Sequence, residues 1–306
     1  MRKFINIFIS PISKVMFNQS LIKNIENELR KIGAITSAIK QLNPVGGGDI
    51  NEAYLLKTKG KDYFIKLNKP NLYPGMFEAE KKGLELLIEK SGFKVPKPIF
   101  SGDMPGHRYI LMEWVEMHSH GDWQLFGSTL ADMHKKTNPQ FGLDHQNYIG
   151  SLFQVNTFEP TWSDFYINHR LHPLCKKAYD SRKLDRTTMR AFENLYQRLD
   201  EIYPVEPSAF LHGDLWSGNR AFTSEGNQCI YDPAVYFGHR EIDLAMTKLF
   251  GGFPDEMYGA YHQKYPLEPG WEERIPIGQL YPLLVHVILF GGGYVGQVAS
   301  IVHRFG

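Results

Sequence analysis

The sequence predicts an α+β protein with two lobes, the first a small antiparallel sheet with one helix and the second mainly α-helical. Between residues 39 and 117, short apolar runs alternate with glycine-containing turns around a single helical segment. After about residue 118, apolar residues recur mostly at helical spacing. The chain has 306 residues, 42% of them hydrophobic, which is enough for a sizeable core.

The N-terminal elements follow in a recognisable order. Residues 20–34 carry apolar residues at helical spacing between a serine and a glycine, which predicts a helix. Residues 39–68 hold three apolar runs separated by the turns GGGD and KGKD, which predicts three antiparallel strands. Residues 75–90 predict another helix, and residues 94–117 predict two more strands. The order is therefore strand, strand, strand, helix, strand, strand.

We assign residues 20–116 to this N-lobe and residues 117–306 to a helical C-lobe. Helical patterns in the second lobe cover residues 121–137, 161–180 and 187–203. The longest apolar run, LYPLLVHVILFGGGYVG, contains a proline, a histidine and a glycine triplet, so we expect a buried helix and not a membrane span.

Composition narrows the possible partners and location. The formal net charge is only +1, so no overall field attracts nucleic acid or an anionic membrane, and any phosphate site must be local. Cys175 and Cys229 are far apart, which favours free thiols in a reducing compartment. We expect a cytoplasmic monomer with no nucleic-acid or membrane partner. Residues 1–19 lack a small-residue cleavage site and are expected to form a loose N-terminal extension.

The turn after the first predicted strand, VGGGDIN, contains Gly46, Gly47 and Gly48. Three glycines let backbone amides approach an anion closely, although a plain hairpin turn has the same composition. The chain has no G-x-x-x-x-G-K-[ST] phosphate loop. A strand and not a helix follows the glycines, which argues against a dinucleotide-binding fingerprint.

The third predicted strand, YFIKLN, carries Lys66 between apolar residues. A half-buried lysine needs a partner charge, whereas a lysine on an edge strand reaches solvent. The following helix offers Glu78 and Glu80. We prefer Glu80 because it shares one helix face with the apolar residues at 77, 84 and 87. Such a pair would hold the ammonium ready for phosphate oxygens.

The stretch FLHGDLWSGN, residues 210–219, holds the strongest chemical signal. Asp214 and Asn219 are followed by a predicted hairpin that returns the chain at Asp232. Oxygen ligands from Asn219 and Asp232 would then lie near one Mg²⁺, beside a carboxylate that orients an acceptor hydroxyl. The alternative is that Asp214 and Asn219 only form turns or cap a helix.

The pattern H-x-D-x-x-x-x-N, followed by a hairpin and an aspartate, resembles the protein-kinase-like fold, and glycine before the aspartate resembles its small-molecule branch. LHGDLWSGN, YDPAVYFGHREIDLAM (231–246), PGMFEAEKKGLELL and PQFGLD (139–144) resemble the fructosamine-kinase, or ketosamine-3-kinase, family. This resemblance extends from about residue 20 to the C-terminus.

The resemblance implies ATP and Mg²⁺ as cofactors and a free or protein-bound ketosamine as substrate, phosphorylated on its 3-hydroxyl in a deglycation repair step. The resemblance implies that Asp214 is the catalytic base and that Asn219 and Asp232 bind magnesium. It implies that Lys66, paired with Glu80, binds the phosphates together with the glycine turn. It also implies that the backbone of Glu113, Trp114 and Val115 binds adenine and that Trp216 contacts the ketosamine. Asp243 is expected to brace the catalytic loop. Pro-Ala after Asp232 makes a regulatory flip of that segment unexpected.

Two other functions stay open. A kinase of the same fold could act on an aminoglycoside or an amino alcohol, although the basic segment HRLHPLCKK (169–177) disfavours a polycation. That segment is either a solvated helix face or part of the substrate entrance. A pseudokinase scaffold usually lacks at least one of the groups needed for catalysis, whereas this sequence contains all of them.

Overall fold

The structure is a computed structural model that describes residues 19–46 and 50–306. The expected extension up to residue 18 and the predicted phosphate-binding residues Gly47 and Gly48 lie outside the described residues. In the described parts of the chain, no helix is both long enough and apolar enough to cross a membrane.

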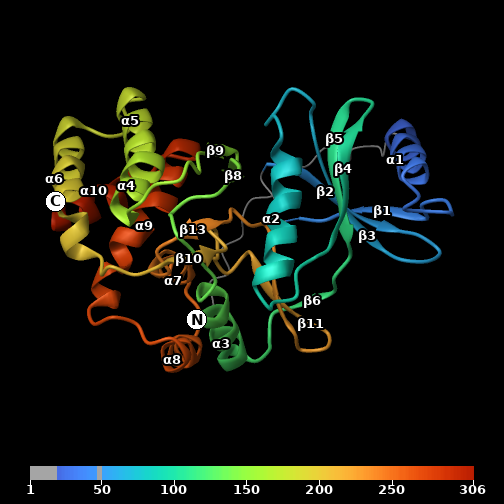
Figure 1. Ribbon diagram of the computed structural model, residues 1–306. Coiled ribbons are helices and arrows are strands. Elements are labelled where there is room, and N and C mark those ends of the chain that lie inside the picture. Colours follow the sequence, from blue (N-terminus) through green and yellow to red (C-terminus); the bar gives the residue numbers. More distant parts are fainter. Residues whose placement is uncertain (1–18, 47–49) are drawn as a thin grey trace, which may run out of the picture.

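The N-lobe is a five-stranded antiparallel sheet with a helix on each face (Figure 1). Its strands are β1 (Gln41–Pro44), β2 (Glu52–Lys57), β3 (Tyr63–Asn68), β4 (Pro98–Met104) and β5 (His107–Glu113), and its helices are α1 (Gln19–Lys31) and α2 (Met76–Lys90). The sheet order is β1-β2-β3-β5-β4, so β3 is the central strand. The predicted order of strands and helices is therefore confirmed.

Side chains along each strand point alternately to the two faces of this sheet, and the two faces pack against different helices. Ile65 and Leu67 of β3 share a core cluster with Ile25 and Leu29 of α1. Because successive strand residues point to opposite faces, Lys66 lies on the other face, which α2 covers. The central strand thus carries its lysine toward α2 and the C-lobe.

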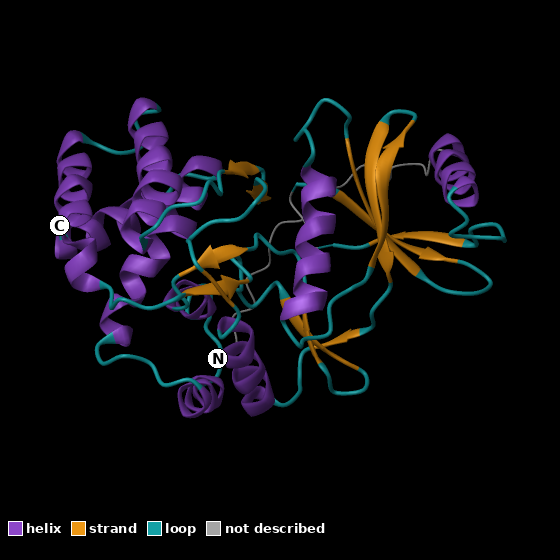
Figure 2. Ribbon diagram, viewed as in Figure 1, coloured by secondary structure: helices purple, strands orange, loops and turns teal. Residues whose placement is uncertain are grey.

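The C-lobe is mainly helical, as predicted, with three small sheets (Figure 2). Its helices are α3 (Trp123–His134), α4 (Trp162–Tyr166), η1 (Ile167–Leu171, a π-helix), α5 (His172–Asp180), α6 (Arg186–Ile202), α7 (Glu241–Thr247), α8 (Asp255–Lys264), α9 (Trp271–Leu289) and α10 (Gly293–Phe305). Its strands are β6 (Met117–His118), β7 (Thr137–Asn138), β8 (Asn147–Ile149), β9 (Leu152–Gln154), β10 (Ser208–Leu211), β11 (Arg220–Thr223), β12 (Gln228–Ile230) and β13 (Tyr236–Gly238). The apolar run, residues 280–296, is divided between the end of α9 and the start of α10, so the expected single helix is wrong. The part in α9 is mostly buried, as expected, whereas Phe290 is exposed.

The two lobes share a continuous core. Phe77 and Leu84 of α2 belong to the same buried cluster as Phe126 of α3 and Leu211 of β10. We propose a lobe boundary between residues 116 and 117, supported by the pairing of β6 with β11 of the C-lobe. Because α2 packs on both lobes, the side chains on its inner face are held at the junction.

Candidate active site

Strand β10 delivers the chain into the loop that holds Asp214. Gly213 has φ 81°, and a Cβ there would lie 2.1 Å from the carbonyl oxygen of Ala234. Only glycine fits a left-handed residue so close to a neighbouring backbone. Asp232 also adopts a left-handed φ of 56°, a conformation that aspartate tolerates better than most residues. The segments around Asp214 and Asp232 therefore lie side by side.

Asp243 of α7 braces this loop from beneath, as expected. Its fully buried carboxylate accepts hydrogen bonds from the backbone N–H of His212 at 2.7 Å and of Gly213 at 2.9 Å. His134 of α3 reaches the same carboxylate at 3.2 Å. Hydrogen bonds between a carboxylate and backbone N–H groups are among the stronger ones, so the loop entering Asp214 is held firmly.

Asn219 connects the two aspartates. Its Nδ2 donates to Asp214 Oδ2 at 3.1 Å, to the Asp214 carbonyl at 2.9 Å and to the Asp232 carbonyl at 3.4 Å. Its Oδ1 makes no hydrogen bond within residues 19–46 and 50–306, so it is available to a ligand. The predicted return of the hairpin to Asn219 is confirmed, because the Tyr231 N–H donates to the Asn219 carbonyl. Neither Asp214 nor Asn219 caps a described helix, so the helix-capping alternative is wrong, although Asn219 does end a turn that begins at Trp216.

The Lys66 side chain, on the N-lobe sheet, contacts acidic side chains of both lobes. Its Nζ lies 2.7 Å from Glu80 Oε1 and 2.5 Å from Asp232 Oδ1. Burial disfavours the ammonium, but the charges of Asp232 and Glu80 outweigh it and raise the pKa of Lys66. The alternative of an edge lysine is wrong because β3 is central and Lys66 is 9% exposed. The expected pairing with Glu80 is confirmed, while Glu78 is exposed.

The donor set suits magnesium. Asp232 keeps a second carboxylate oxygen beyond the one paired with Lys66, and its side chain is 45% exposed. Mg²⁺ usually takes one or two protein oxygens together with water and phosphate oxygens, so Asn219 and Asp232 fit it. Among the described residues, no group of three or more His, Cys, Asp or Glu side chains is arranged to hold a metal ion.

Asp214 has the proton affinity of a general base. Burial and the nearby charge of Asp232 raise its pKa from 3.8 to about 7, although the hydrogen bond from Asn219 opposes the shift. A base whose pKa lies near the working pH combines a usable ionised fraction with a strong pull on a proton. The geometry and the pKa together make Asp214 a candidate acceptor of a hydroxyl proton.

The raised pKa of Asp214 predicts a pH-dependent stability of the unliganded protein. Between about pH 4 and pH 7 the folded state binds this proton and the unfolded state does not, so stability falls as pH rises. The Asp214→Asn variant has no carboxyl group at this position, so its stability should not fall with pH for this reason. Without metal or nucleotide, its melting temperature relative to the wild type should rise between pH 5 and pH 8 by a few degrees, or about 1–2 kcal/mol after allowing for partial exposure. An equal difference at both pH values would contradict the raised pKa.

Trp216 folds back over its own loop. A Cβ on Gly218 would lie 2.3 Å from the indole, so glycine is required for the ring to occupy this position. The ring is half-buried and meets Phe250 edge-on, with centroids 5.9 Å apart. Sequence reasoning missed Gly218 and Phe250. A glycine two residues after a tryptophan in a tight loop was the available signal for the first.

The segment expected to meet adenine follows β5. The Glu113 carboxylate accepts from Lys94 Nζ at 2.5 Å and from the Lys97 N–H at 3.0 Å, so it faces the sheet lobe. The Trp114 N–H makes only a long bond of 3.4 Å to Asp62. The Val115 N–H has no partner in the described part of the chain, so it remains available to a ligand. Gly46 is described, whereas residues 47–49 of its turn lie outside the described residues.

The basic segment 169–177 is not a simple solvated face. Arg170 is fully buried in the π-helix, where it donates to the carbonyl of Val155 and to Asn156 Oδ1. Its guanidinium also lies 4.2 Å from the centroid of the Tyr236 ring. The solvated-face interpretation is therefore wrong for Arg170, which instead supports the strand following Asp232. Exposed Lys176 pairs with Asp180 on the surface.

A lysine–glutamate pair on a sheet lobe, opposite an Asp-Asn-Asp set on a helical lobe, defines a phosphotransferase of the protein-kinase-like fold. The solved structure of an aminoglycoside phosphotransferase shares this fold, with a TM-score of 0.60 at 14% identity over 93% of this chain and 99% of that one. The chain belongs to the fructosamine kinase family, whose profile matches residues 21–305. It is an ATP-dependent kinase.

Relatives of this chain carry related names. A probable ketoamine kinase of Enterococcus faecium is 41% identical over 86% of this chain and 94% of its own length. A chloroplastic protein-ribulosamine 3-kinase of Arabidopsis thaliana is 38% identical, covering 87% of this chain and 83% of its own. The crystal structure of a putative fructosamine-3-kinase from Haemophilus somnus has a TM-score of 0.82 at 25% identity, covering 92% of this chain and 97% of that one.

Proposed function

We propose that the protein transfers a phosphoryl group from ATP to the 3-hydroxyl of the sugar in ketosamines such as ribulosamines and fructosamines, a deglycation step. The observation that carries this proposal is the position of Asp214, hydrogen-bonded to Asn219 and close to the Lys66–Asp232 pair. The names of the relatives support the ketosamine as acceptor.

Each residue has a role in this proposal. Asp214 orients the sugar hydroxyl and accepts its proton. Lys66, held by Glu80, binds phosphate oxygens, and the backbone at Val115 binds adenine. Asn219 and Asp232 hold Mg²⁺, which when bound would offset the negative charge of the phosphates. The loop from Asp214 to Asn219 is already braced by Asp243, so little reorganisation is needed when substrates bind.

We also propose a cytoplasmic location and a monomeric state. Both cysteines are buried and unpaired, which supports a reducing compartment. Substrates would be small ketosamines or ketosamines attached to proteins.

A substrate panel tests the proposed function. The protein should transfer phosphate from ATP to the ribulosamine and fructosamine of Nα-acetyllysine, and phosphorus NMR should place the phosphate on the 3-oxygen. Kanamycin, an aminoglycoside, and ethanolamine, an amino alcohol, are tested as the alternative acceptors. Phosphorylation of kanamycin or ethanolamine without ketosamine turnover would contradict the proposal.

Gly218→Ala should displace the Trp216 indole, because the new methyl group occupies the space of the ring. If the indole lies against the sugar, KM for ketosamine should rise about tenfold while KM for ATP stays within about twofold, which corresponds to about 1.4 kcal/mol of lost binding. Trp216→Ala should give the same pattern. A change in the ATP constant alone would place the indole elsewhere.

A further inference from the structure

Trp216 is the first of a row of aromatic side chains that leads away from the catalytic loop. Its ring meets Phe250, whose centroid lies 4.8 Å from the ring of His286. The ring of Tyr294, at the start of α10, lies 4.9 Å from that of His286 and 6.4 Å from that of Phe250, measured between centroids. All four side chains are half-buried. The row, called here the aromatic wall, joins the loop after Asp214 to α9 and α10.

The backbone fixes Phe250 within this wall. Phe250 has a left-handed φ of 55°, and Ser217 of the catalytic loop donates to its carbonyl at 3.3 Å. A left-handed conformation is costly for a residue with a bulky side chain and is typical of sites that hold a ligand. Phe250 is thereby tied to the loop that carries Trp216.

His286 brings an unused hydrogen-bond acceptor to the wall. Its Nδ1 lies 2.7 Å from the carbonyl of Pro282, which can only accept, so Nδ1 carries the proton. Burial lowers the pKa of His286, against that hydrogen bond, and favours the neutral ring. Nε2 is then an acceptor, and it has no partner within residues 19–46 and 50–306. The hydroxyl of Tyr294 likewise has none there.

Building on the function proposed above, we propose that His286 Nε2 accepts a hydrogen bond from the amine of the ketosamine, between the rings of Phe250 and Tyr294. The amine is bonded to C1 of the sugar, two carbons from the hydroxyl placed at Asp214. A secondary alkylamine at neutral pH is positively charged and has two N–H donors. A neutral imidazole nitrogen flanked by aromatic faces suits such a group.

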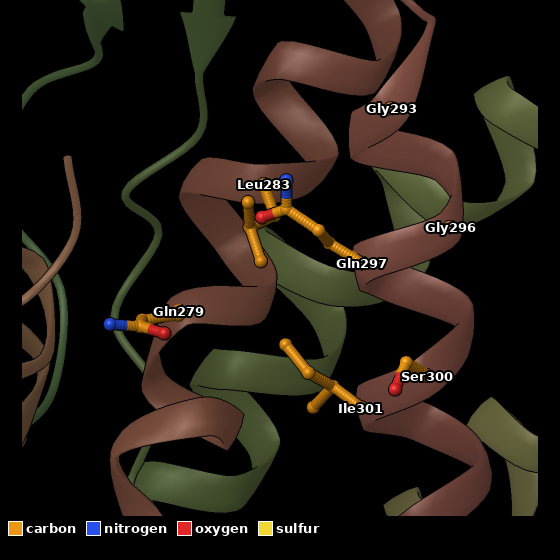
Figure 3. Close-up of a pocket in the computed structure, with 7 residues that line it drawn as sticks. All are labelled: Gln279, Leu283, Gly293, Gly296, Gln297, Ser300 and Ile301. Carbon is orange, nitrogen blue, oxygen red and sulfur yellow. The ribbon is translucent and has the colours of Figure 1, made fainter.

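A groove of about 410 Å³ provides space for the substituent on this nitrogen. It lies between α9 and α10 and is lined only by uncharged residues, including Gln279, Leu283 and Gln297 (Figure 3). Leu283 and Gln279 precede His286 by three and seven residues, so they share its face of α9. The groove therefore continues from the wall along the same pair of helices. A lysine side chain bearing the sugar fits this uncharged path.

Two acceptors, one with the substituted amine at C1 and one with neither the amine nor its substituent, test this assignment. The ketosamine is the ribulosamine of Nα-acetyllysine, and the amine-free compound is 1-deoxyribulose, followed as a substrate or, through its inhibition constant, as a competitor. His286→Leu should lower kcat/KM for the ketosamine about 10- to 100-fold, the scale of a hydrogen bond to a charged group. The constant for 1-deoxyribulose should change less than about twofold.

Two further variants make the result specific. His286→Gln retains an acceptor and should recover part of the loss, whereas Phe290→Leu alters an exposed ring 5.5 Å from His286 and should leave both constants unchanged. Equal losses for both compounds, or no loss for the ketosamine, would overturn the role of His286. A wild-type protein that phosphorylates no ketosamine would overturn the proposed function itself, and this result is obtained before any variant is made.

Discussion

Replacing Asp214 with asparagine is expected to lower kcat by about two to four orders of magnitude, the usual contribution of a positioned general base. Asparagine has nearly the same shape and still reaches Asn219, but it cannot take up the proton of the acceptor hydroxyl. The loop should keep its position because Asp243 holds the backbone of His212 and Gly213. The measurement is steady-state turnover with ketosamine at saturating ATP.

Nucleotide binding provides the control for this variant. The proposed ATP-binding groups come from Lys66, Glu80 and the segment at Val115, none of which bonds to the Asp214 side chain. The dissociation constant of ATP, measured by calorimetry, should therefore stay within about threefold of the wild type. Turnover near the wild-type value would remove Asp214 from the chemistry.

Lys66→Met is expected to have the second large effect, lowering kcat/KM for ATP about 100-fold or more, the scale of losing one charged donor in a phosphate or oxyanion site. The substitution also leaves the buried Glu80 and the nearby Asp232 without their shared cation. Removing one partner of a buried ion pair costs up to about 3–5 kcal/mol, reduced here because Asp232 is partly exposed and Glu80 can take up a proton. The melting temperature should therefore fall as well.

Two matched variants separate the loss of catalysis from the loss of stability. Glu80→Gln leaves Lys66 paired with Asp232 and should reduce kcat/KM for ATP by about tenfold. Lys81→Met removes a lysine from the exposed side of α2, where it pairs with Glu85, and should leave ATP kinetics unchanged. If Lys66→Met had unaltered ATP kinetics, Lys66 would have no phosphate role.

The sequence was sufficient to predict the elements that carry strong local patterns. The N-lobe order followed from apolar periodicity and from the turns at GGGD and KGKD. The hairpin that returns Asp232 to Asn219 followed from its turn residues. Glu80 could be chosen over Glu78 because helix geometry separates the two faces of α2. These inferences depend on contacts between segments that are close in sequence or on one helix.

Other features depend on contacts that no local pattern encodes. The short strands β7, β10 and β13 form a sheet only because distant segments meet there. Arg170 lies in a basic segment of the sequence, but Asn156, Tyr236 and Tyr281, from three other segments, surround its guanidinium. The need for glycine at 213 arises from the carbonyl of Ala234, which lies on a later segment of the chain. Such requirements become visible only when the folded neighbours are known.

The proposed phosphoryl transfer depends most on Asn219 and Asp232 sharing one metal ion opposite Lys66. A crystal structure with a non-hydrolysable ATP analogue and Mn²⁺ in place of Mg²⁺ would locate that ion by its anomalous scattering. We predict an ion bound by Asn219 Oδ1 and the Asp232 carboxylate, with Lys66 Nζ on a phosphate oxygen and Asp214 free of metal. A nucleotide bound elsewhere, or an ion that contacts neither Asn219 nor Asp232, would contradict the account.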